Sequence, residues 1–268
     1  MNKWKESELV RSLLGFFLLF LLFVGLFIFV VPSTHQSSKI AEKIKSIKNE
    51  KVTYVAIGDS LTQGVGDSSN QGGFVPVLSQ ALESDFDWQV TSRNYGIAGN
   101  TSNQILKRMQ EKKDIQRDLK KAKVMTLTVG GNDVIHVIKD NITNLNVDTF
   151  TKPAQAYQKR LGQIIELARK DNKTLPIYIV GIYNPFYLNF PEMTEMQTIV
   201  DNWNQSTEEV CKKYDNVYFV PVNDLLYKGI DGKGGVTSSD DSSQSSKSSQ
   251  DSLNDALFEV IKLCQMPF

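Results

Sequence analysis

Five runs rich in β-branched and aromatic residues alternate with four helical patterns between residues 52 and 222, and this order constrains the fold more than any other feature. The expected strands cover residues 52–58, 88–96, 123–131, 175–183 and 217–222, and the expected helices cover 73–84, 102–112, 150–170 and 196–214. Strands that alternate with helices are typical of a parallel sheet with helices on both faces. The pattern therefore predicts an α/β fold around a five-stranded parallel sheet.

The charge balance and the cysteine content argue against two further classes of protein. The 268 residues include 30 basic and 30 acidic side chains, so no basic patch favours nucleic acid as a partner. Two cysteines are too few for a disulfide framework. Cys211 falls in a helical pattern and is expected to be a small buried hydrophobic residue.

An uncharged apolar run near the N-terminus has the length of a membrane span. Residues 12–31 read SLLGFFLLFLLFVGLFIFVV, and about 20 apolar residues cross the core of a bilayer. Basic residues in segment 1–11 favour a cytoplasmic N-terminus, although lysines also follow the run. A cleaved signal peptide is the rival interpretation, but the run is longer than a usual signal core and lacks a small-residue cleavage site. We therefore expect an uncleaved single-pass anchor in the cell membrane, with the globular part outside the cytoplasm.

The remaining segments divide the chain around the globular part. Residues 32–51 are expected to form a short connector, and residues 52–235 the globular domain. Residues 236–252 read VTSSDDSSQSSKSSQDS and have almost nothing apolar to bury, so a disordered loop or linker is expected. Residues 253–268 form a C-terminal tail.

Three loops with polar residues each follow a predicted strand. GDSLTQGVG (58–66) contains Ser60, NYGIAGNTS (94–102) contains Gly99, and VGGNDV (129–134) contains Asn132. Because the carboxyl ends of parallel strands meet at one edge of a sheet, where α/β proteins bind ligands, we expect these three residues to converge. A hydroxyl can attack an acyl carbonyl, and a bare backbone N–H and a carboxamide can stabilise the resulting oxyanion. Taken singly, each loop has a plainer interpretation as a helix cap or a turn.

Together the loops resemble the sequence blocks of the GDSL, or SGNH, family of lipases and acylhydrolases in order and spacing. The match consists of GDSL at 58–61, Gly99, and GGND at 130–133, and it covers about residues 52–226. The resemblance implies that Ser60 is the nucleophile and that the Ser60 N–H, the Gly99 N–H and the Asn132 amide form the oxyanion hole. It also implies a three-layer α/β/α sandwich that hydrolyses carboxylic esters or thioesters through an acyl-serine intermediate, with no metal or cofactor. The substrate class would be a lipid, an acylated sugar or a small ester.

Two aspartates and one further loop complete the expected site. Asp59 and Asp133 are expected to brace their loops rather than to act as acid or base. Residues 184–196, NPFYLNFPEMTEM, supply apolar and aromatic side chains that either line an acyl groove or serve as ordinary lid and packing residues.

The last block of the family, Asp-x-x-His near the C-terminus, has no counterpart after the last expected strand of this sequence. Its histidine is the base that activates the serine, whereas the only histidines here are His35 and His136. The explanation we prefer is a truncated or frameshifted chain. In the second explanation, His136 substitutes as the base, because it lies about one helical turn after Asn132. In the third, the protein is a membrane-tethered module that binds an acyl ligand without turnover. The sequence thus predicts an ester hydrolase whose catalysis is impaired.

Overall fold

The computed structural model describes residues 50–68, 70–141, 146–184, 194–230 and 233–234. The predicted anchor at 12–31, the connector up to residue 49, the serine-rich segment 236–252 and the tail 253–268 lie outside these residues. Within the described ranges, no helix combines the length and the apolar character needed to cross a bilayer.

A five-stranded parallel sheet forms the centre of the fold, and this confirms the prediction. Its strands are β1 (Lys51–Gly58), β2 (Gln89–Gly96), β3 (Ala122–Thr128), β4 (Ile177–Val180) and β5 (Val217–Val220), in the order β2-β1-β3-β4-β5. The chain passes from β1 outward to β2 and then crosses to the other side of β1 for β3. Such a reversal of strand order leaves a crevice at the carboxyl ends of the strands. The loops after β1, β2 and β3 all begin at this edge.

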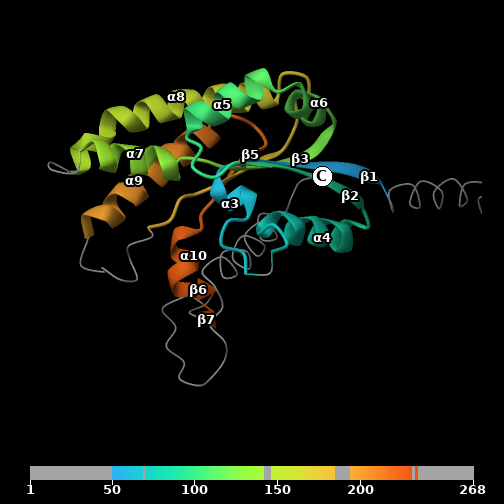
Figure 1. The fold of residues 1–268 in the computed structure, drawn as a ribbon, viewed down its shortest axis with the longest axis horizontal. Helices are drawn as coiled ribbons and strands as arrows, with labels where there is room; N and C mark the ends of the chain where they lie inside the picture. The colour runs from blue at the N-terminus through green and yellow to red at the C-terminus, as the bar shows by residue number, and fades with distance from the viewer. Residues whose placement is uncertain (1–49, 69, 142–145, 185–193, 231–232, 235–268) are drawn as a thin grey trace, which may run out of the picture. The chain divides into compact units, whose positions relative to one another are not determined.

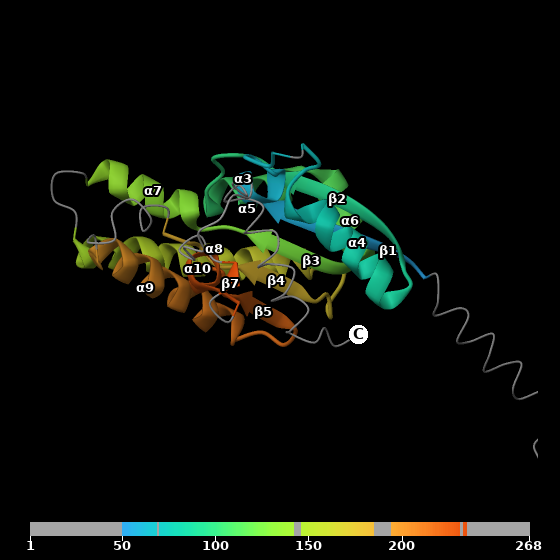
Figure 2. The same cartoon turned by 90° about the horizontal axis from the view of Figure 1, so that it is seen from below.

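Helices cover both faces of the sheet (Figure 1). One face carries α5 (Ser102–Glu111), α6 (Lys113–Lys121), α7 (Gly131–Asp140), α8 (Thr151–Ala168) and α9 (Thr194–Cys211). The opposite face, seen from its own side in Figure 2, carries α4 (Phe74–Phe86) and α10 (Asn223–Lys228). Alternate residues of β1 face opposite ways: Ile57 packs into the core under α5–α9, and Tyr54 into the core under α4. The described chain is therefore a three-layer α/β/α sandwich.

Some elements lie where the sequence pattern predicted none. The helices α3 (Ser60–Gln63), α6 and α10 are additional, α7 begins inside the expected third loop, and η1 (Val147–Phe150), β6 (Gly229–Ile230) and β7 (Lys233–Gly234) are short. In α6 only Ile115 and Leu119 are apolar among nine residues, and both are buried one turn apart. Two apolar positions do not separate a helix from a polar loop by periodicity, which is why α6 was missed.

Cys211 lies at the end of α9 and is buried, which confirms the prediction made for it. Burial raises the pKa of its thiol to about 12. The thiol therefore stays protonated at neutral pH and acts as a packing group.

Candidate active site

Ser60 is the first residue of α3, directly beyond the carboxyl end of β1. Asp59 caps this short helix, because its carboxylate accepts a hydrogen bond from the Leu61 N–H at 3.1 Å. The N–H of Ser60 belongs to the first turn of the helix and has no partner within it. Among the described residues the Ser60 hydroxyl has no hydrogen-bond partner either. Both polar groups of Ser60 are thus available to a ligand.

Thr128, the last residue of β3, ties the Ser60 loop to the neighbouring strand. Its hydroxyl donates to the Asp59 carboxylate at 2.8 Å, and its oxygen accepts from the Asp59 N–H at 3.2 Å. The same oxygen lies 2.8 Å from the Thr62 hydroxyl. Since the single Thr128 hydrogen points at the carboxylate, the Thr62 hydroxyl is the donor in the third contact. Asp59 therefore braces its loop, as predicted from the sequence.

Burial governs the ionisation of Asp59. The side chain is 5% exposed, and desolvation raises the pKa of its carboxyl above the ordinary value. The hydrogen bonds from the Thr128 hydroxyl and the Leu61 N–H act in the opposite direction, and the nearby Asp133 charge raises the pKa slightly further. The carboxylate is thus held by donors in a site that disfavours its charge.

Asn132 and the Gly99 segment lie side by side. The Asn132 carboxamide donates from Nδ2 to the Asn100 carbonyl oxygen at 3.0 Å. A carboxamide nitrogen carries two hydrogens, so one remains for another acceptor. Gly99 has a φ of +79°, and a Cβ added there would meet nothing within 4 Å. Because glycine has no side chain and the space around Gly99 is open, the backbone there is accessible.

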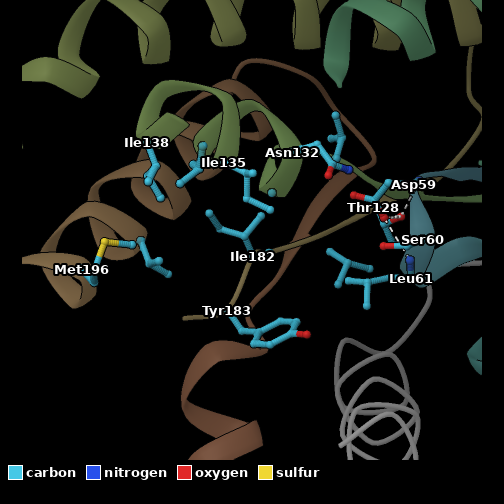
Figure 3. A pocket seen from close by; sticks show the side chains of 16 residues that line it. Asp59, Ser60, Leu61, Thr128, Asn132, Ile135, Ile138, Ile182, Tyr183 and Met196 are labelled. Carbon is cyan, nitrogen blue, oxygen red and sulfur yellow. Dashed lines mark hydrogen bonds between the residues drawn. The ribbon is translucent and has the colours of Figure 1, made fainter. Parts of the chain in front are cut away.

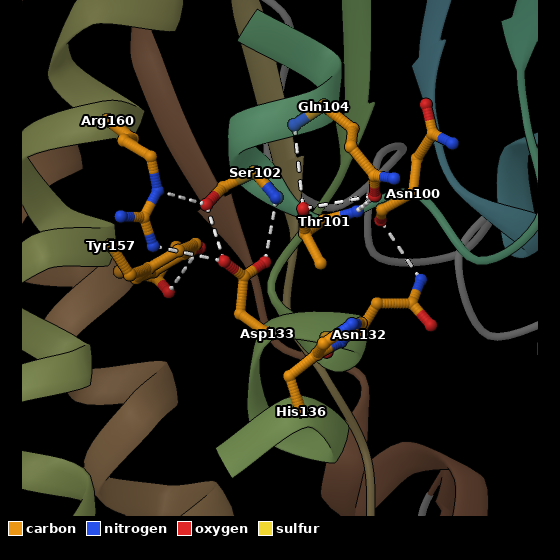
Figure 4. A network of polar contacts seen from close by, with 10 residues as sticks. Asn100, Thr101, Ser102, Gln104, Asn132, Asp133, His136, Tyr157 and Arg160 are labelled. Carbon is orange, nitrogen blue, oxygen red and sulfur yellow. Dashed lines mark hydrogen bonds and ion pairs between the residues drawn. The ribbon is translucent and has the colours of Figure 1, made fainter. Parts of the chain in front are cut away.

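A buried polar network holds the same two loops together (Figure 4). The Asp133 carboxylate accepts from the Ser102 N–H at 2.8 Å and from the Ser102 hydroxyl at 2.5 Å. Arg160, on α8, donates from Nε to the Ser102 hydroxyl oxygen at 2.7 Å and from Nη2 to Asp133 at 3.1 Å. Ser102 is fully buried and Asp133 is 7% exposed. Asp133 therefore braces its loop, again as predicted.

A pocket of about 200 Å³ opens beside Ser60 at the switch point of the sheet (Figure 3). Its polar end holds Asp59, Ser60, Thr128 and Asn132. Its other walls are mainly aliphatic and come from α7, α9 and the end of β4, with Ile135, Ile138, Ile182, Tyr183, Met196 and Val200 among them. The arrangement suits a ligand with one polar, reactive end and one apolar end.

Tyr183 contributes the phenol of the pocket wall. Burial raises the pKa of this phenol, and the Asp59 charge raises it further. At neutral pH the Tyr183 hydroxyl is therefore protonated and can donate a hydrogen bond.

The structure brings some of the predicted site residues together and leaves others apart. Ser60 and Asn132 line one pocket, whereas Gly99 joins them through the Asn132–Asn100 bond and is not itself part of the lining. His136 is exposed on α7, its Nδ1 lies 2.7 Å from the Asn132 carbonyl oxygen, and it does not line the pocket. A nitrogen at that position donates to the carbonyl, so the ring would carry its proton on Nδ1.

Sequence reasoning missed Thr128, Ser102 and Arg160. Thr128 had a readable signal, because a hydroxyl in a strand buried on both faces requires a partner. Arg160 had a weaker one: it lies three residues after Tyr157 and one before Leu161, at the flank of the buried helix face. Ser102 looked like an ordinary residue of a helix start, and nothing in the sequence pointed to its bond with Asp133.

Comparison with known proteins agrees with this architecture. The model of the GDSL-like Lipase/Acylhydrolase family matches residues 56–241, more than half of the chain. The uncharacterised protein YpmR of Bacillus subtilis (strain 168) is 32% identical over 201 residues, which cover 74% of this chain and 78% of YpmR. The spore germination lipase LipC of Bacillus licheniformis is 27% identical over 183 residues, which cover 66% of this chain and 82% of LipC. The crystal structure of the lipase Lip_vut3 from a goat rumen metagenome shares the fold with a TM-score of 0.62 at 21% identity, covering 78% of this chain and 97% of Lip_vut3. The chain therefore belongs to the GDSL-like lipase/acylhydrolase family of serine ester hydrolases.

Proposed function

We propose that this chain cleaves carboxylic esters, or thioesters, in the pocket beside Ser60, with Ser60 as the nucleophile. One observation carries the proposal. Ser60 and Asn132 line the same pocket, and the Asn132 amide donates to the carbonyl of Asn100, the residue after Gly99. This arrangement supports a shared site for the proposed nucleophile and the two proposed oxyanion donors. No plain turn or helix cap requires that combination.

The proposed reaction follows from these groups. The Ser60 oxygen attacks the acyl carbon, its proton leaves to a base, and negative charge develops on the former carbonyl oxygen. The Ser60 N–H, the Gly99 N–H and the second hydrogen of Asn132 Nδ2 bind that oxyanion; one good donor is worth about 2.7–4 kcal/mol. The intermediate expels the alcohol or thiol, which takes up the proton that Ser60 lost, and leaves an acyl-serine. Water then attacks the same carbon and releases the acid.

The pocket lining supports an aliphatic acyl group as the part of the substrate that enters it. Each methylene moved from water into such a lining contributes about 0.8 kcal/mol. Ile138 and Met196 lie far from Ser60 along the pocket in Figure 3. We therefore expect p-nitrophenyl esters of medium-length acids to have a higher kcat/KM than the acetate.

The supply of a base limits the proposed activity. No Asp-x-x-His follows residue 222 in the sequence. The only such spacing, Asp133 to His136, lies in α7, and there His136 is engaged with a backbone carbonyl outside the pocket. Impaired turnover is therefore part of the proposal, with a residual rate that comes from oxyanion binding and substrate positioning. If His136 acts as the substitute base, His136→Ala should abolish this residual rate.

Labelling and turnover of the full-length chain in mild detergent test the assignment. A fluorophosphonate should modify Ser60, identified by peptide mass spectrometry, and Ser60→Ala should remove both labelling and p-nitrophenyl ester hydrolysis. Ser84→Ala is the matched control, because Ser84 is an exposed serine on α4 whose hydroxyl bonds only local groups. Labelling at another serine, or turnover that survives Ser60→Ala, would refute the assignment. Acyl-ligand binding by calorimetry with neither signal would instead support the non-catalytic binding module.

A single-pass membrane anchor at residues 12–31 is part of the same proposal. Its support is the uncharged apolar run and the basic residues that precede it. The chain should then stay in the membrane fraction after alkaline carbonate extraction, and protease added to spheroplasts should digest the globular domain. Release by carbonate, or full protection from protease, would contradict the anchor or its orientation.

A further inference from the structure

Arg160 connects the two loops that hold two of the proposed oxyanion donors. It comes from α8, outside every motif of the sequence, and it reaches the first residue of α5 and the third residue of α7. Its Nε donates to the Ser102 hydroxyl oxygen at 2.7 Å, and its Nη2 donates to Asp133 Oδ1 at 3.1 Å. One guanidinium thus binds both loops at once.

The direction of every hydrogen bond in this network is determined by the groups present. Arg160 can only donate and an ionised Asp133 can only accept, so the Ser102 hydroxyl donates to Asp133 and accepts from Arg160. The Asp133 charge is nearly buried, and the ion pair with Arg160 offsets the cost of removing it from water. Each hydrogen bond among Arg160, Ser102 and Asp133 therefore has one direction, which favours a single arrangement of the three side chains.

The loops are attached to each other at two points, and Arg160 supports one of them. At the first point, Asn132 Nδ2 donates to the Asn100 carbonyl at 3.0 Å. At the second, the Ser102 N–H and hydroxyl both donate to the Asp133 carboxylate, at 2.8 Å and 2.5 Å. A single point of attachment would allow one loop to pivot on the other, whereas two points restrict both the distance and the angle between the loops. Gly99 directly precedes Asn100, so its N–H direction depends on this angle.

We propose that Arg160 is a positioning residue, which sets the geometry between the Gly99 N–H and the Asn132 amide without touching the substrate. The inference rests on the proposed function of those two donors. An oxyanion hole is effective because its donors are already aimed at the developing charge. A displacement of about 1 Å lowers the rate of such a site by about 10²-fold.

Arg160→Lys is the direct test, because it retains the positive charge and removes the planar pair of donors. With the full-length chain and a p-nitrophenyl ester, kcat should fall about 10- to 100-fold while KM changes less than about twofold, since the apolar pocket is intact. Amide hydrogen exchange in residues 97–103 should also become faster, and this readout does not require turnover. Should Arg160→Lys fail to fold, Ser102→Ala replaces it, because it removes the hydroxyl link and keeps the ion pair.

Arg169→Lys provides a matched control at the end of α8, the helix that carries Arg160. Arg169 follows α8 and donates three hydrogen bonds, two to the Leu175 carbonyl and one to the Asn216 carbonyl, at the opposite edge of the sheet. This variant should lose stability with kcat and exchange in residues 97–103 unchanged. Equal kcat and equal exchange in Arg160→Lys and Arg169→Lys would overturn the proposal. A wild-type chain without turnover or labelling would refute the proposed function instead, and the exchange comparison would still decide whether Arg160 fixes the loops.

Discussion

Replacing Thr128 by valine tests whether the loop that carries Ser60 is held by hydrogen bonds or by packing. Thr128 is 1% exposed, and its side chain has the shape of valine with one methyl exchanged for a hydroxyl. The substitution retains the volume of the side chain. It removes a donor to the Asp59 carboxylate at 2.8 Å and an acceptor for the Asp59 N–H at 3.2 Å.

The expected loss of stability is about 3 kcal/mol. A hydrogen bond to a charged group contributes about 1.5–3 kcal/mol, and a buried N–H left without an acceptor costs about 1–3 kcal/mol. The additional buried methyl offsets about 1 kcal/mol of this. Thr62 adds little to the loss, since its hydroxyl also lies 3.3 Å from the Ile57 carbonyl and keeps that acceptor.

Thr128→Ser is the matched variant, because it keeps the hydroxyl and loses only the methyl, at a cost of about 1 kcal/mol. Urea denaturation followed by tryptophan fluorescence should show a lower midpoint for valine than for serine, with the m-value unchanged. At an m-value of about 2 kcal/mol/M, the valine variant should lose about 1.5 M in midpoint. A valine variant as stable as the serine variant, or more stable, would refute the view that hydrogen bonds hold this loop.

Two further substitutions test the backbone and the charge of the site. Gly130 has a φ of +110°, and a Cβ there would lie 2.8 Å from Trp203 Nε1, so Gly130→Ala should cost about 2–4 kcal/mol in chemical denaturation. Gly66→Ala, with a φ of +88° and no atom within 4 Å of the added Cβ, should cost only about 1 kcal/mol, and equal losses would contradict the steric account. Burial raises the pKa of Asp59, so the folded state binds this proton more tightly than the unfolded chain, and the contribution of Asp59 to stability falls as pH rises above about 4. In thermal melts, the stability of Asp59→Asn relative to wild type should therefore rise between about pH 4 and pH 7. A stability difference that stays constant across this range would show that Asp59 does not cause the pH dependence.

Strands β1 and β3 were predictable because burial on both faces leaves continuous apolar runs. Residues 52–58 and 123–131 were expected to be strands, and β1 and β3 occupy most of these positions. The positions of Ser60, Gly99 and Asn132 at one edge followed from the direction of parallel strands alone. The local signal and the topology agreed in this part of the chain.

The contacts that hold the site were not predictable to the same extent. Arg160 and Ser102 are 58 positions apart in the sequence, and no spacing rule links residues on two different helices. α7 was treated as a loop because VGGNDV has the composition of a turn. The helix begins at Gly131 all the same, because Gly130 adopts a positive φ that L-residues rarely take.

The described residues supply more for one part of the proposed chemistry, the binding of the oxyanion, than for the other, the removal of the Ser60 proton. The proposed oxyanion donors are held by the scaffold, since hydrogen bonds fix Asn132 and the segment that follows Gly99. The proton of Ser60 has no comparable acceptor among the described groups of the pocket: the Asp59 carboxylate is engaged with Thr128 and Leu61, and the raised pKa of Tyr183 keeps its phenol protonated. Attack by Ser60 therefore requires that its proton pass to water or to a group outside these residues. Because stabilising the oxyanion and activating the nucleophile are separate contributions to the rate, the proposed site would bind and polarise an acyl group even where the second contribution is small.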